Sequence, residues 1–391
     1  MESLSSYLKY ETKVIHLLKE KIKSETGSER NIMVQYKYRS YFFDLVELGD
    51  NDKILKIYEI KSHSAIKRNF EFIKHLLEMY SQATRAQVYL VFLDANEQLH
   101  IISKDELKRD LCLIASQNES ENMIYEVSSL SEFPNILHKI SKKENEGNRE
   151  SRLFFRGHSD IGYNSVPSIF RDNGIDHEDQ MYRDAIRKEP SIFTEDMSTF
   201  DKLVKMQHYE LPTRLLDITT NPLVALYFAC QSNKDENGVE KDGAVLLFQI
   251  IEEQIKYYDD VPVCILSNLA KCPNSFSFSK DKKDLVFKIQ QDLHNFNEND
   301  LKAGDLEFVY CVLPKLNNQR IIRQQGAFFI FGKGKNKKDP AKLQPKPIII
   351  KIKASSKKEI LDDLQVFGIE EATLFPETDK IMKQIKSQFI N

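Results

Sequence analysis

The first part of the chain changes between helical and strand periodicity in a regular order. Apolar residues recur at three- and four-residue steps over residues 4–22, which predicts an amphipathic helix. A strand-rich stretch at 33–48 leads to a Gly-Asp-Asn-Asp break at 49–52, whose residues are typical of a hairpin turn. Residues 54–62 then continue as a second strand, so this region predicts a helix followed by a hairpin.

The same alternation continues beyond the hairpin. The helical step returns over residues 70–84, and the continuous apolar run 87–94 is typical of a buried central strand. A short strand follows at 99–102. Helix, hairpin, helix and strand together predict a complete small α/β unit.

A polar stretch at residues 116–122 marks the next boundary, which we interpret as a linker. We therefore predict a first domain over residues 1–115 and a second domain over residues 123–391. The second domain begins with an ordered segment at 123–140. A polar insert, 141–151, follows this segment.

Beyond the insert the pattern mixes strands and helices, which predicts a mixed α+β domain. Strands are predicted at 153–156, 243–250, 308–314, 327–331 and 347–352. Helices are predicted at 181–188, 222–231 and 357–367. The segment 332–346 holds six lysines and one aspartate, and we interpret it as a solvated loop, with a basic ligand-contacting loop as the alternative.

Composition narrows the class of protein. The chain has 391 residues, of which 41% are hydrophobic and 29% charged, as in an ordinary globular protein. No apolar run approaches the roughly 20 residues that cross a bilayer, so no membrane partner is expected. The net charge of −3 argues against a protein that coats nucleic acid, although it allows a local basic groove.

Cysteine usage points to a reducing compartment. The five cysteines form neither a CxxC pair nor an even framework, and they lie at Cys112, Cys230, Cys264, Cys272 and Cys311. We expect most of them to serve as small hydrophobic residues in a cytoplasmic protein.

A first group of chemically active residues lies around the predicted hairpin. Because a strand alternates faces, Leu55, Ile57, Glu59 and Lys61 share one face. An acid and a lysine at the end of an apolar face are costly unless they have a partner or a function. Asp44 lies inside the preceding strand, and pairing across the turn would bring it beside Glu59.

Two adjacent carboxylates suit a hard divalent cation such as Mg²⁺. Such a cation would lower the pKa of a bound water and stabilise charge on a phosphodiester, while Lys61 would position or activate that water. Glu11 lies on the apolar stripe of the first helix and could supply a third acid. The predicted metal ligands are therefore Glu11, Asp44 and Glu59, and the predicted catalytic residues are Asp44, Glu59 and Lys61.

The spacing of the charged residues resembles the motif of the PD-(D/E)XK nuclease superfamily, because Asp44 is followed after a 14-residue gap by Glu59-Ile60-Lys61. The order of elements over roughly residues 1–110 resembles that superfamily as well. The resemblance implies a restriction-endonuclease-like α/β fold that cleaves nucleic acid with a metal. The sequence departs from the full motif because Phe43 stands where proline is usual. Two alternatives remain: a paired acid and lysine on an edge strand, or an inactive nuclease fold that persists as a binding platform.

A second group begins with the triplet Phe155-Arg156-Gly157 at the end of a predicted strand. Glycine allows close backbone approach, and the planar fork of arginine suits phosphate or carboxylate. The ordinary alternative is an arginine that only forms a salt bridge.

The segment 206–231 is denser in polar motifs. A short buried strand at Leu215-Leu216 ends at Asp217, and a helix follows with Asn221 as its N-cap and Pro222 as its first residue. Helix N-termini receive phosphates, so the polar residues before this helix form the candidate site. They are Arg214, Asp217, Thr219 and Thr220. The alternative is a buried hydrogen-bonded network of Gln207, His208, Arg214 and Asp217.

The later motifs complete a family resemblance. A series of spaced motifs resembles the FRG domain family over about residues 123–391. The motifs are the Phe-Arg-Gly triplet, QHYELPTRLLD, NPLVALYFA, Arg320 with Gln325-Gly326-Ala327-Phe328, and Leu374-Phe375-Pro376. Three positions depart from the usual pattern: His158, Glu210 and Ile218.

The order of these motifs is similar to that of the ADP-ribosyltransferase fold. That similarity implies that Arg156, beside Gly157, holds the phosphate or ribose of NAD, and that Thr219 and Thr220 form the second motif. Gln325 would occupy the third position, where a neutral amide offers less than a carboxylate to a developing cation. Acid–base function would then come from His208 or Asp217.

Together the two domains suggest a bacterial defence or toxin protein. Its expected partners are nucleic acid and a nucleotide or NAD. The alternative is a non-catalytic sensor, with an inactive nuclease fold and a ligand-recognising FRG domain. The substrate, the trigger and the oligomeric state are not indicated by the sequence.

Overall fold

The computed structural model describes residues 2–26, 31–38, 41–94, 96–107, 124–145 and 151–376. The chain divides into two compact units. The first comprises Met1–Glu121 with Lys139–Ser151, and the second comprises Asn122–His138 with Arg152–Asn391. The linker expected at 116–122 and Cys112 lie outside the described residues.

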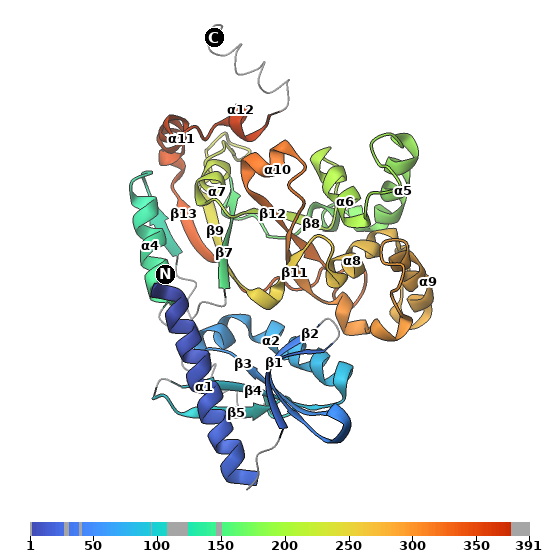
Figure 1. Ribbon diagram of the computed structural model, residues 1–391. Coiled ribbons are helices and arrows are strands. Elements are labelled where there is room, and N and C mark those ends of the chain that lie inside the picture. Colours follow the sequence, from blue (N-terminus) through green and yellow to red (C-terminus); the bar gives the residue numbers. More distant parts are fainter. Residues whose placement is uncertain are drawn as a thin grey trace. The chain divides into compact units, whose positions relative to one another are not determined.

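The first unit follows the predicted order of elements, except that the stretch 33–48, expected as the first strand of the hairpin, forms two strands, β1 and β2 (Figure 1). It contains α1 (Glu2–Thr26), β1 (Asn31–Tyr38), β2 (Tyr41–Leu48), β3 (Ile54–Ile60), α2 (His63–Thr84), β4 (Gln87–Leu93) and β5 (Leu99–Ser103). The sheet order is β1-β2-β3-β4-β5. All neighbours are antiparallel except β3 and β4, which run parallel because α2 connects them. The predicted hairpin between β2 and β3 is confirmed.

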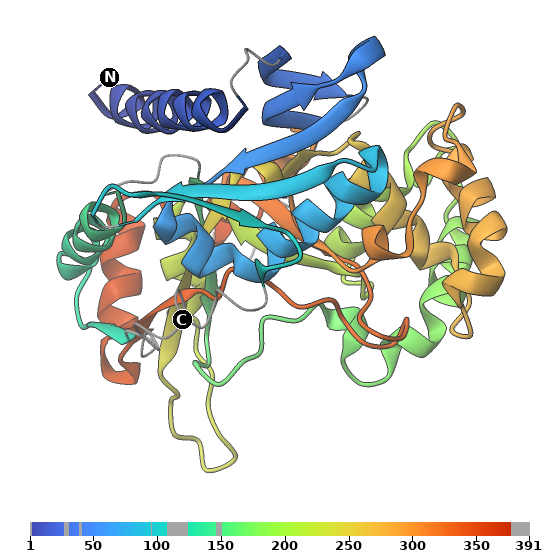
Figure 2. The same ribbon diagram turned by 90° about the horizontal axis from the view of Figure 1, so that it is seen from below.

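Helix α1 covers one face of this sheet. Val14, Leu18 and Ile22 lie one turn apart and are buried against residues of β2, β3 and β4. Residues of the opposite parity face away from α1, and among them Phe92 stacks on His63 of α2 at a ring distance of 5.8 Å. Figure 2 shows the two helices on either side of the strands.

The second unit is larger and mixes helices with strands. Its strands are β6 (Ile124–Val127), β7 (Ser151–His158), β8 (Leu215–Thr219), β9 (Gly243–Ile251), β10 (Ile255–Tyr257), β11 (Val309–Leu313), β12 (Gly326–Phe331) and β13 (Ile348–Ile352). They form one sheet in the order β10-β11-β12-β8-β7-β9-β13-β6. Its core contains alternate residues of the central strands, including Phe154, Leu216, Phe248 and Phe329.

Helices surround this sheet. They are α5 (Glu178–Lys188), α6 (Thr199–His208), α7 (Pro222–Ala229), α8 (Val261–Asn268), α9 (Phe278–Gln290), α10 (Gln319–Gln324), α11 (Lys357–Val366) and α12 (Glu371–Leu374). Helices α5, α6, α8 and α9 gather at one end of the sheet (Figures 1 and 2). Helix α4 (Glu132–Asn145) contains the division between the two units and extends into the segment expected as a polar insert.

The lysine-rich segment at 332–346 is the clearest departure from the sequence prediction. Lys333 and Lys337 are 8% and 2% exposed, so the expectation of a solvated loop is wrong for both residues. The Lys337 ammonium donates to the carbonyl of Cys272 at 2.7 Å and lies 3.0 Å from a carboxylate oxygen of Glu178. The ion pair with Glu178, a buried acid at the start of a helix distant in sequence, therefore holds Lys337 and its loop in the interior.

Two composition-based expectations can be compared with the structure. The four cysteines within the described ranges (Cys230, Cys264, Cys272 and Cys311) are free and buried, which confirms their use as small hydrophobic residues. No helix among the described residues is long and apolar enough to span a membrane.

Candidate functional sites

The β2–β3 hairpin brings Asp44 and Glu59 together. Leu45 pairs with Tyr58, so the next residue of each strand, Asp44 and Glu59, stand opposite each other. The ladder then opens, and an Asp44 carboxylate oxygen accepts the backbone N–H of Ile60 at 2.7 Å. The side chain of Asp44 thus replaces a backbone partner at the point where β2 and β3 separate.

Lys61 completes this group from the residue after β3. Its ammonium lies 2.7 Å from a Glu59 carboxylate oxygen and 3.7 Å from an Asp44 oxygen. The side chains of Lys61 and Glu59 are almost fully buried, whereas that of Asp44 is 19% exposed. Asp44, Glu59 and Lys61, predicted as one site from the sequence, therefore converge.

Helix α1 reaches the same end of the sheet, but Glu11 has a different partner. The Tyr10 hydroxyl donates to the carbonyl of Lys61 at 3.3 Å and accepts the N–H of Leu93 at 3.1 Å. The carboxylate of the next residue, Glu11, accepts a hydrogen bond from Gln35 of β1 at 2.8 Å. Within the described ranges, no three His, Cys, Asp or Glu side chains gather closely enough to hold a metal ion. The expected three-acid ligand set is therefore not assembled, because Glu11 is bonded to β1.

The two acids of this site still fit a divalent cation. Mg²⁺ is commonly bound through one or two carboxylates, with water and substrate phosphate as the other ligands. Asp44 and Glu59 supply such carboxylates side by side, next to the ammonium of Lys61. The chemistry of the donor set thus suits Mg²⁺ or Mn²⁺.

In the second unit, Gly157 explains one part of the Phe-Arg-Gly triplet. A Cβ atom at this position would lie 2.0 Å from the carbonyl oxygen of Ala225 and 2.7 Å from the backbone nitrogen of Ala229. Both are backbone atoms of α7, which cannot move aside as the end of a flexible side chain could. Glycine is therefore required for the close approach of β7 to α7, as its position in the sequence predicted.

Arg156 is half-buried at the end of β7. Its Nε donates to Nε2 of His158 at 3.1 Å, and its Nη1 donates to the carbonyl of Asp217 at 2.5 Å. Burial lowers the pKa of Arg156, although the charge of Asp217 opposes that shift. The arginine is thus fixed in orientation by two acceptors from β7 and β8.

His158 is the partner that sequence reasoning missed, since it was noted only as a departure from the usual family pattern. It is 3% exposed, and burial, reinforced by the charges of Arg156 and Arg171, lowers its pKa to about 4. The imidazole is neutral at pH 7 and accepts from Arg156 through Nε2. Its position two residues after Arg156 on the same strand was the available signal, because such residues share a face.

The predicted motifs of the second unit meet in one row of the sheet. Phe155 of β7 pairs with Thr219 of β8, and Thr219 pairs with Gly326 of β12. This row therefore joins the triplet, the two threonines and the residue after Gln325. The exposed side chain of Asp217 lies two residues earlier on β8.

Both threonine hydroxyls are engaged with the backbone before β12. Thr219 donates to the carbonyl of Gln324 at 2.7 Å, and Thr220 donates to that of Gln325 at 3.4 Å. Gln325 has a left-handed backbone, with φ 45°, and caps α10. These contacts hold the end of β8 against the start of β12. The cation beside this row of residues is Arg156.

Arg214 lies apart from this row. It directly precedes β8, and five residue steps along an extended strand separate it from Thr219 by about 16 Å. Its guanidinium is fully buried and donates to both carboxylate oxygens of Glu178 and to the carbonyl of Phe331. Burial raises the pKa of Glu178, but the charges of Arg214 and Lys337 outweigh it and lower that pKa. This geometry favours a structural role for Arg214.

His208 ends α6, and its ring lies 5.0 Å from that of Tyr209. Gln207 accepts a hydrogen bond from the Thr213 hydroxyl. The QHY motif and the following turn are thus linked to each other, while the buried network expected to include Asp217 does not form, because Asp217 is exposed.

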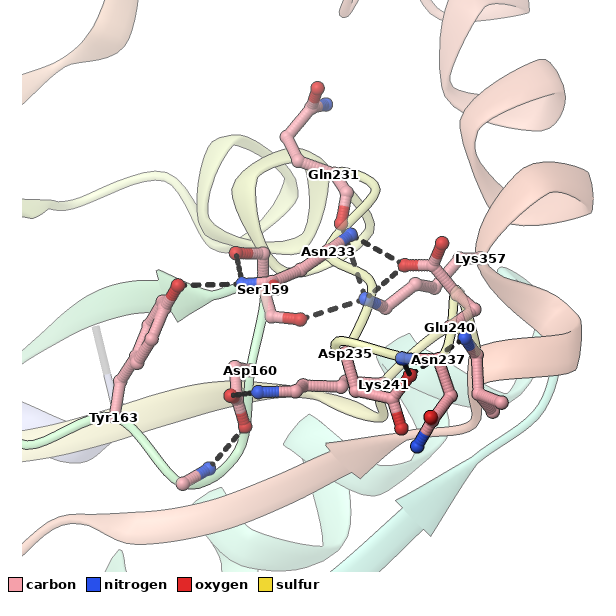
Figure 3. A network of polar contacts seen from close by, with 12 residues as sticks. Ser159, Asp160, Tyr163, Gln231, Asn233, Asp235, Asn237, Glu240, Lys241 and Lys357 are labelled. Atoms are coloured by element: carbon pink, nitrogen blue, oxygen red, sulfur yellow. Dashed lines mark hydrogen bonds and ion pairs between the residues drawn. The ribbon is translucent and has the colours of Figure 1, made fainter.

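A polar network supports the loop after β7 (Figure 3). The buried ammonium of Lys357 donates to the carbonyls of Ser159 and Gln231 at 2.8 and 3.1 Å and to Glu240 at 3.1 Å. These acceptors come from the loops after β7 and α7. Lys357, at the start of α11, therefore joins three segments that are distant in sequence.

The same network reaches His158. Lys241 binds Asp160 at 2.8 Å, and the Asn233 amide donates to the Tyr163 hydroxyl at 2.6 Å. The Tyr163 ring lies edge-on to His158 at 6.0 Å. The orientation of the Arg156–His158 pair is thus supported by contacts from the loop after α7.

Comparison with known protein families matches residues 151–238 to the FRG domain. The match begins with β7 and ends in the loop after α7, so it contains the triplet, the QHY motif and α7. The sequence resemblance to this family is therefore confirmed over these residues. No curated protein and no solved structure matches the chain.

Proposed function

We propose that the first unit is a divalent-metal-dependent nuclease. The observation that carries this proposal is the convergence of Asp44, Glu59 and Lys61, which come from two strands and the residue after them. A bound Mg²⁺ would supply a more acidic water and a positive charge for the phosphodiester. Asp44 and Glu59 would hold the cation, and Lys61 would position the attacking water.

The opening of the strand ladder supports this assignment over an ion pair on a regular edge strand. The ladder between β2 and β3 ends at Asp44, so one carboxylate is partly exposed at the edge of the group. Nucleic acid approaching from that side would present its phosphates to the cation.

The test is cleavage of single- and double-stranded DNA and RNA in Mg²⁺ or Mn²⁺. We expect Glu59→Ala to remove cleavage and Lys61→Ala to reduce it by at least about 100-fold. Glu106→Ala, an exposed acid of the same unit, serves as the control and should cleave normally. An unmodified protein that cuts no nucleic acid with either metal would contradict the proposal and favour an inactive fold that binds nucleic acid.

For the FRG domain we propose binding of a nucleotide or NAD through Arg156. The specific observation is that His158 and the Asp217 carbonyl hold its guanidinium at the row where β7, β8 and β12 meet. An oriented arginine fork suits a phosphate. In the ADP-ribosyltransferase-like form of this proposal, Asp217 supplies the nearby carboxylate that Gln325 lacks.

Arg152→Ala is a matched control for Arg156→Ala, since Arg152 lies on the same strand and forms an exposed pair with Glu252. We expect NAD or nucleotide binding to weaken at least tenfold in Arg156→Ala and to stay unchanged in Arg152→Ala. Binding and NAD turnover that survive in Arg156→Ala would refute this assignment. A nucleic-acid module joined to a nucleotide module would suit a bacterial defence role.

A further inference from the structure

Strand β2 carries an exposed aromatic side chain close to the proposed metal site. Phe42 is 61% exposed, the highest value among the large hydrophobic residues that the structure describes in the first unit. It lies two residues before Asp44 on the strand, a rise of about 7 Å. Aromatic rings contribute most to cores and interfaces, and this ring contributes little to the core. An interface is therefore the role to consider for it.

The backbone that carries this ring is fixed by its neighbours. The next residue, Phe43, is 1% exposed and meets the ring of Tyr80 edge-on at a centroid distance of 4.8 Å. The Tyr80 hydroxyl also donates to the carbonyl of Phe42 at 3.5 Å. Because Tyr80 belongs to α2, the strand is held against that helix while the ring of Phe42 stays in solvent. The ring is thus presented on a rigid element.

A lysine from the neighbouring strand lies over the same ring. Lys37 of β1 pairs with Phe42 of β2, and its ammonium is 5.3 Å from the ring centroid. Lys37 is exposed, and no carboxylate among the described residues pairs with it. The two side chains therefore present an aromatic ring and a cation that no acid of the protein neutralises.

This pair has the two features that hold single-stranded nucleic acid. Such strands are bound by aromatic rings on which bases stack and by basic groups that contact the phosphates. Lysine is long and flexible, so its ammonium can turn to a phosphate when a base stacks on the ring. The bases of a duplex already stack on one another, and an exposed ring thus favours an unpaired strand. Residues 36–43 read YKYRSYFF, which interleaves aromatic and basic residues around the pair.

We propose that Phe42 and Lys37 form a substrate subsite next to Asp44, in which Phe42 stacks on an unpaired base and Lys37 contacts the adjoining phosphate. This inference rests on the proposed nuclease function and assigns to it a single-stranded DNA or RNA substrate. The short distance along β2 lets one strand occupy the subsite and reach the carboxylates at the same time.

The experiment measures the binding of short labelled single strands, one of DNA and one of RNA, to the full chain by fluorescence anisotropy. Binding is measured in EDTA, where a metal-dependent nuclease does not cleave. We expect Phe42→Ala to weaken binding of the preferred strand about tenfold, as is typical for the loss of one stacked base. Phe42→Tyr keeps the ring and should bind as the unmodified protein does. Leu55→Ala is the control, since Leu55 is an exposed apolar residue near the turn of the hairpin.

A salt titration tests the phosphate contact of Lys37. We expect Lys37→Ala to weaken binding and to reduce the slope of the logarithm of the binding constant against that of the salt concentration by about 0.7, which corresponds to one phosphate contact on a single strand. Lys53→Ala, which removes an exposed lysine beside the hairpin turn, should leave the slope unchanged. An unchanged slope in Lys37→Ala would overturn the assignment of Lys37.

Single-strand binding that is unchanged in Phe42→Ala would overturn the inference, and so would an equal loss for a fully paired duplex. A cleavage assay in Mg²⁺ separates this failure from that of the proposed function. A protein that loses cleavage in Glu59→Ala but keeps its single-strand affinity in Phe42→Ala has the proposed function without this subsite. A protein that cleaves no nucleic acid but binds single strands through Phe42 has the subsite without the proposed function.

Discussion

The two units each bury a small group of charges, and the groups differ in composition. In the first unit, the carboxylates of Asp44 and Glu59 lie beside the ammonium of Lys61. In the second unit, one carboxylate, that of Glu178, faces two cations, Arg214 and Lys337. The first group supplies two carboxylates, as many as commonly hold Mg²⁺ in proteins, whereas the second supplies one carboxylate beside two cations.

The partners of the two groups differ as well. Arg214 and Lys337 also donate to the carbonyls of Phe331 and Cys272, so backbone oxygens compensate their excess charge. The acids of the first group lie where a strand ladder opens. Buried charge is thus insufficient to identify a functional site, and the composition of the charged group and its backbone partners are more informative.

The largest effect is expected from Glu178→Ala. It leaves Arg214 and Lys337 buried with no carboxylate between them, and removal of one partner from a buried ion pair typically costs about 3–5 kcal/mol. Denaturant unfolding of the second unit measures this loss. Arg183→Ala is the control on the same helix, where the exposed arginine should contribute below about 1 kcal/mol. A small loss for Glu178→Ala would mean that this group does not stabilise the fold.

Lys61→Met should produce the next largest effect and separates the two groups most directly. It leaves Asp44 and Glu59 facing each other, which we expect to cost about 3 kcal/mol. Mn²⁺ at about 100 times its dissociation constant should restore roughly 2.7 kcal/mol. Thermal unfolding with and without Mn²⁺ measures both quantities. Lys337→Met is the matched variant, and an equal gain from Mn²⁺ in that protein would contradict the comparison.

His158 extends the comparison to a buried group that is neutral. Its folded-state pKa of about 4 lies below the usual value of 6.5, so the unfolded chain binds more protons between these values. The stability it contributes is complete above pH 6.5 and is lost as pH falls toward 4. Between pH 7 and pH 5 we expect a loss of about 2 kcal/mol that disappears in His158→Gln. The difference in unfolding free energy between the two proteins tests this, and parallel pH profiles would contradict it.

The smallest effect is expected from Lys241→Ala. Lys241 is 39% exposed and pairs with Asp160, so solvent screens the pair. We expect a loss of about 0.5 kcal/mol in denaturant unfolding. A loss comparable to that of Glu178→Ala would show that burial does not distinguish these ion pairs.

Much of the first unit and its site could be predicted from local sequence. The Gly-Asp-Asn-Asp turn specified the hairpin, and strand alternation then placed Asp44 near Glu59 and Lys61. This inference succeeded because the residues lie on adjacent strands joined by a short turn, where register follows from turn position. Glu11 was harder to place, since its hydrogen-bond partner Gln35 comes from β1, a strand that the sequence pattern did not separate from β2.

The second unit was less predictable because its partners are distant in the chain. Lys337 belongs to a segment whose composition is typical of a solvated loop, yet it is buried by Glu178. Helix α8 was missed because its residues are apolar around most of the circumference, which removes the periodic signal. The short α6 and α10 lack the length over which periodicity becomes clear.

The sequence by itself determined most elements of the first unit and the hairpin that joins the acids, and it indicated a close backbone approach at Gly157, since these depend on backbone sterics and on periodicity over a few residues. Only the tertiary structure decided which charges are buried and which partners they have. It placed Arg214 with Glu178 and Lys337, Arg156 with His158, and Glu11 with Gln35. The physical reason is that a charge is stabilised or destabilised by its surroundings in space, and those surroundings come from segments that the chain order keeps far apart.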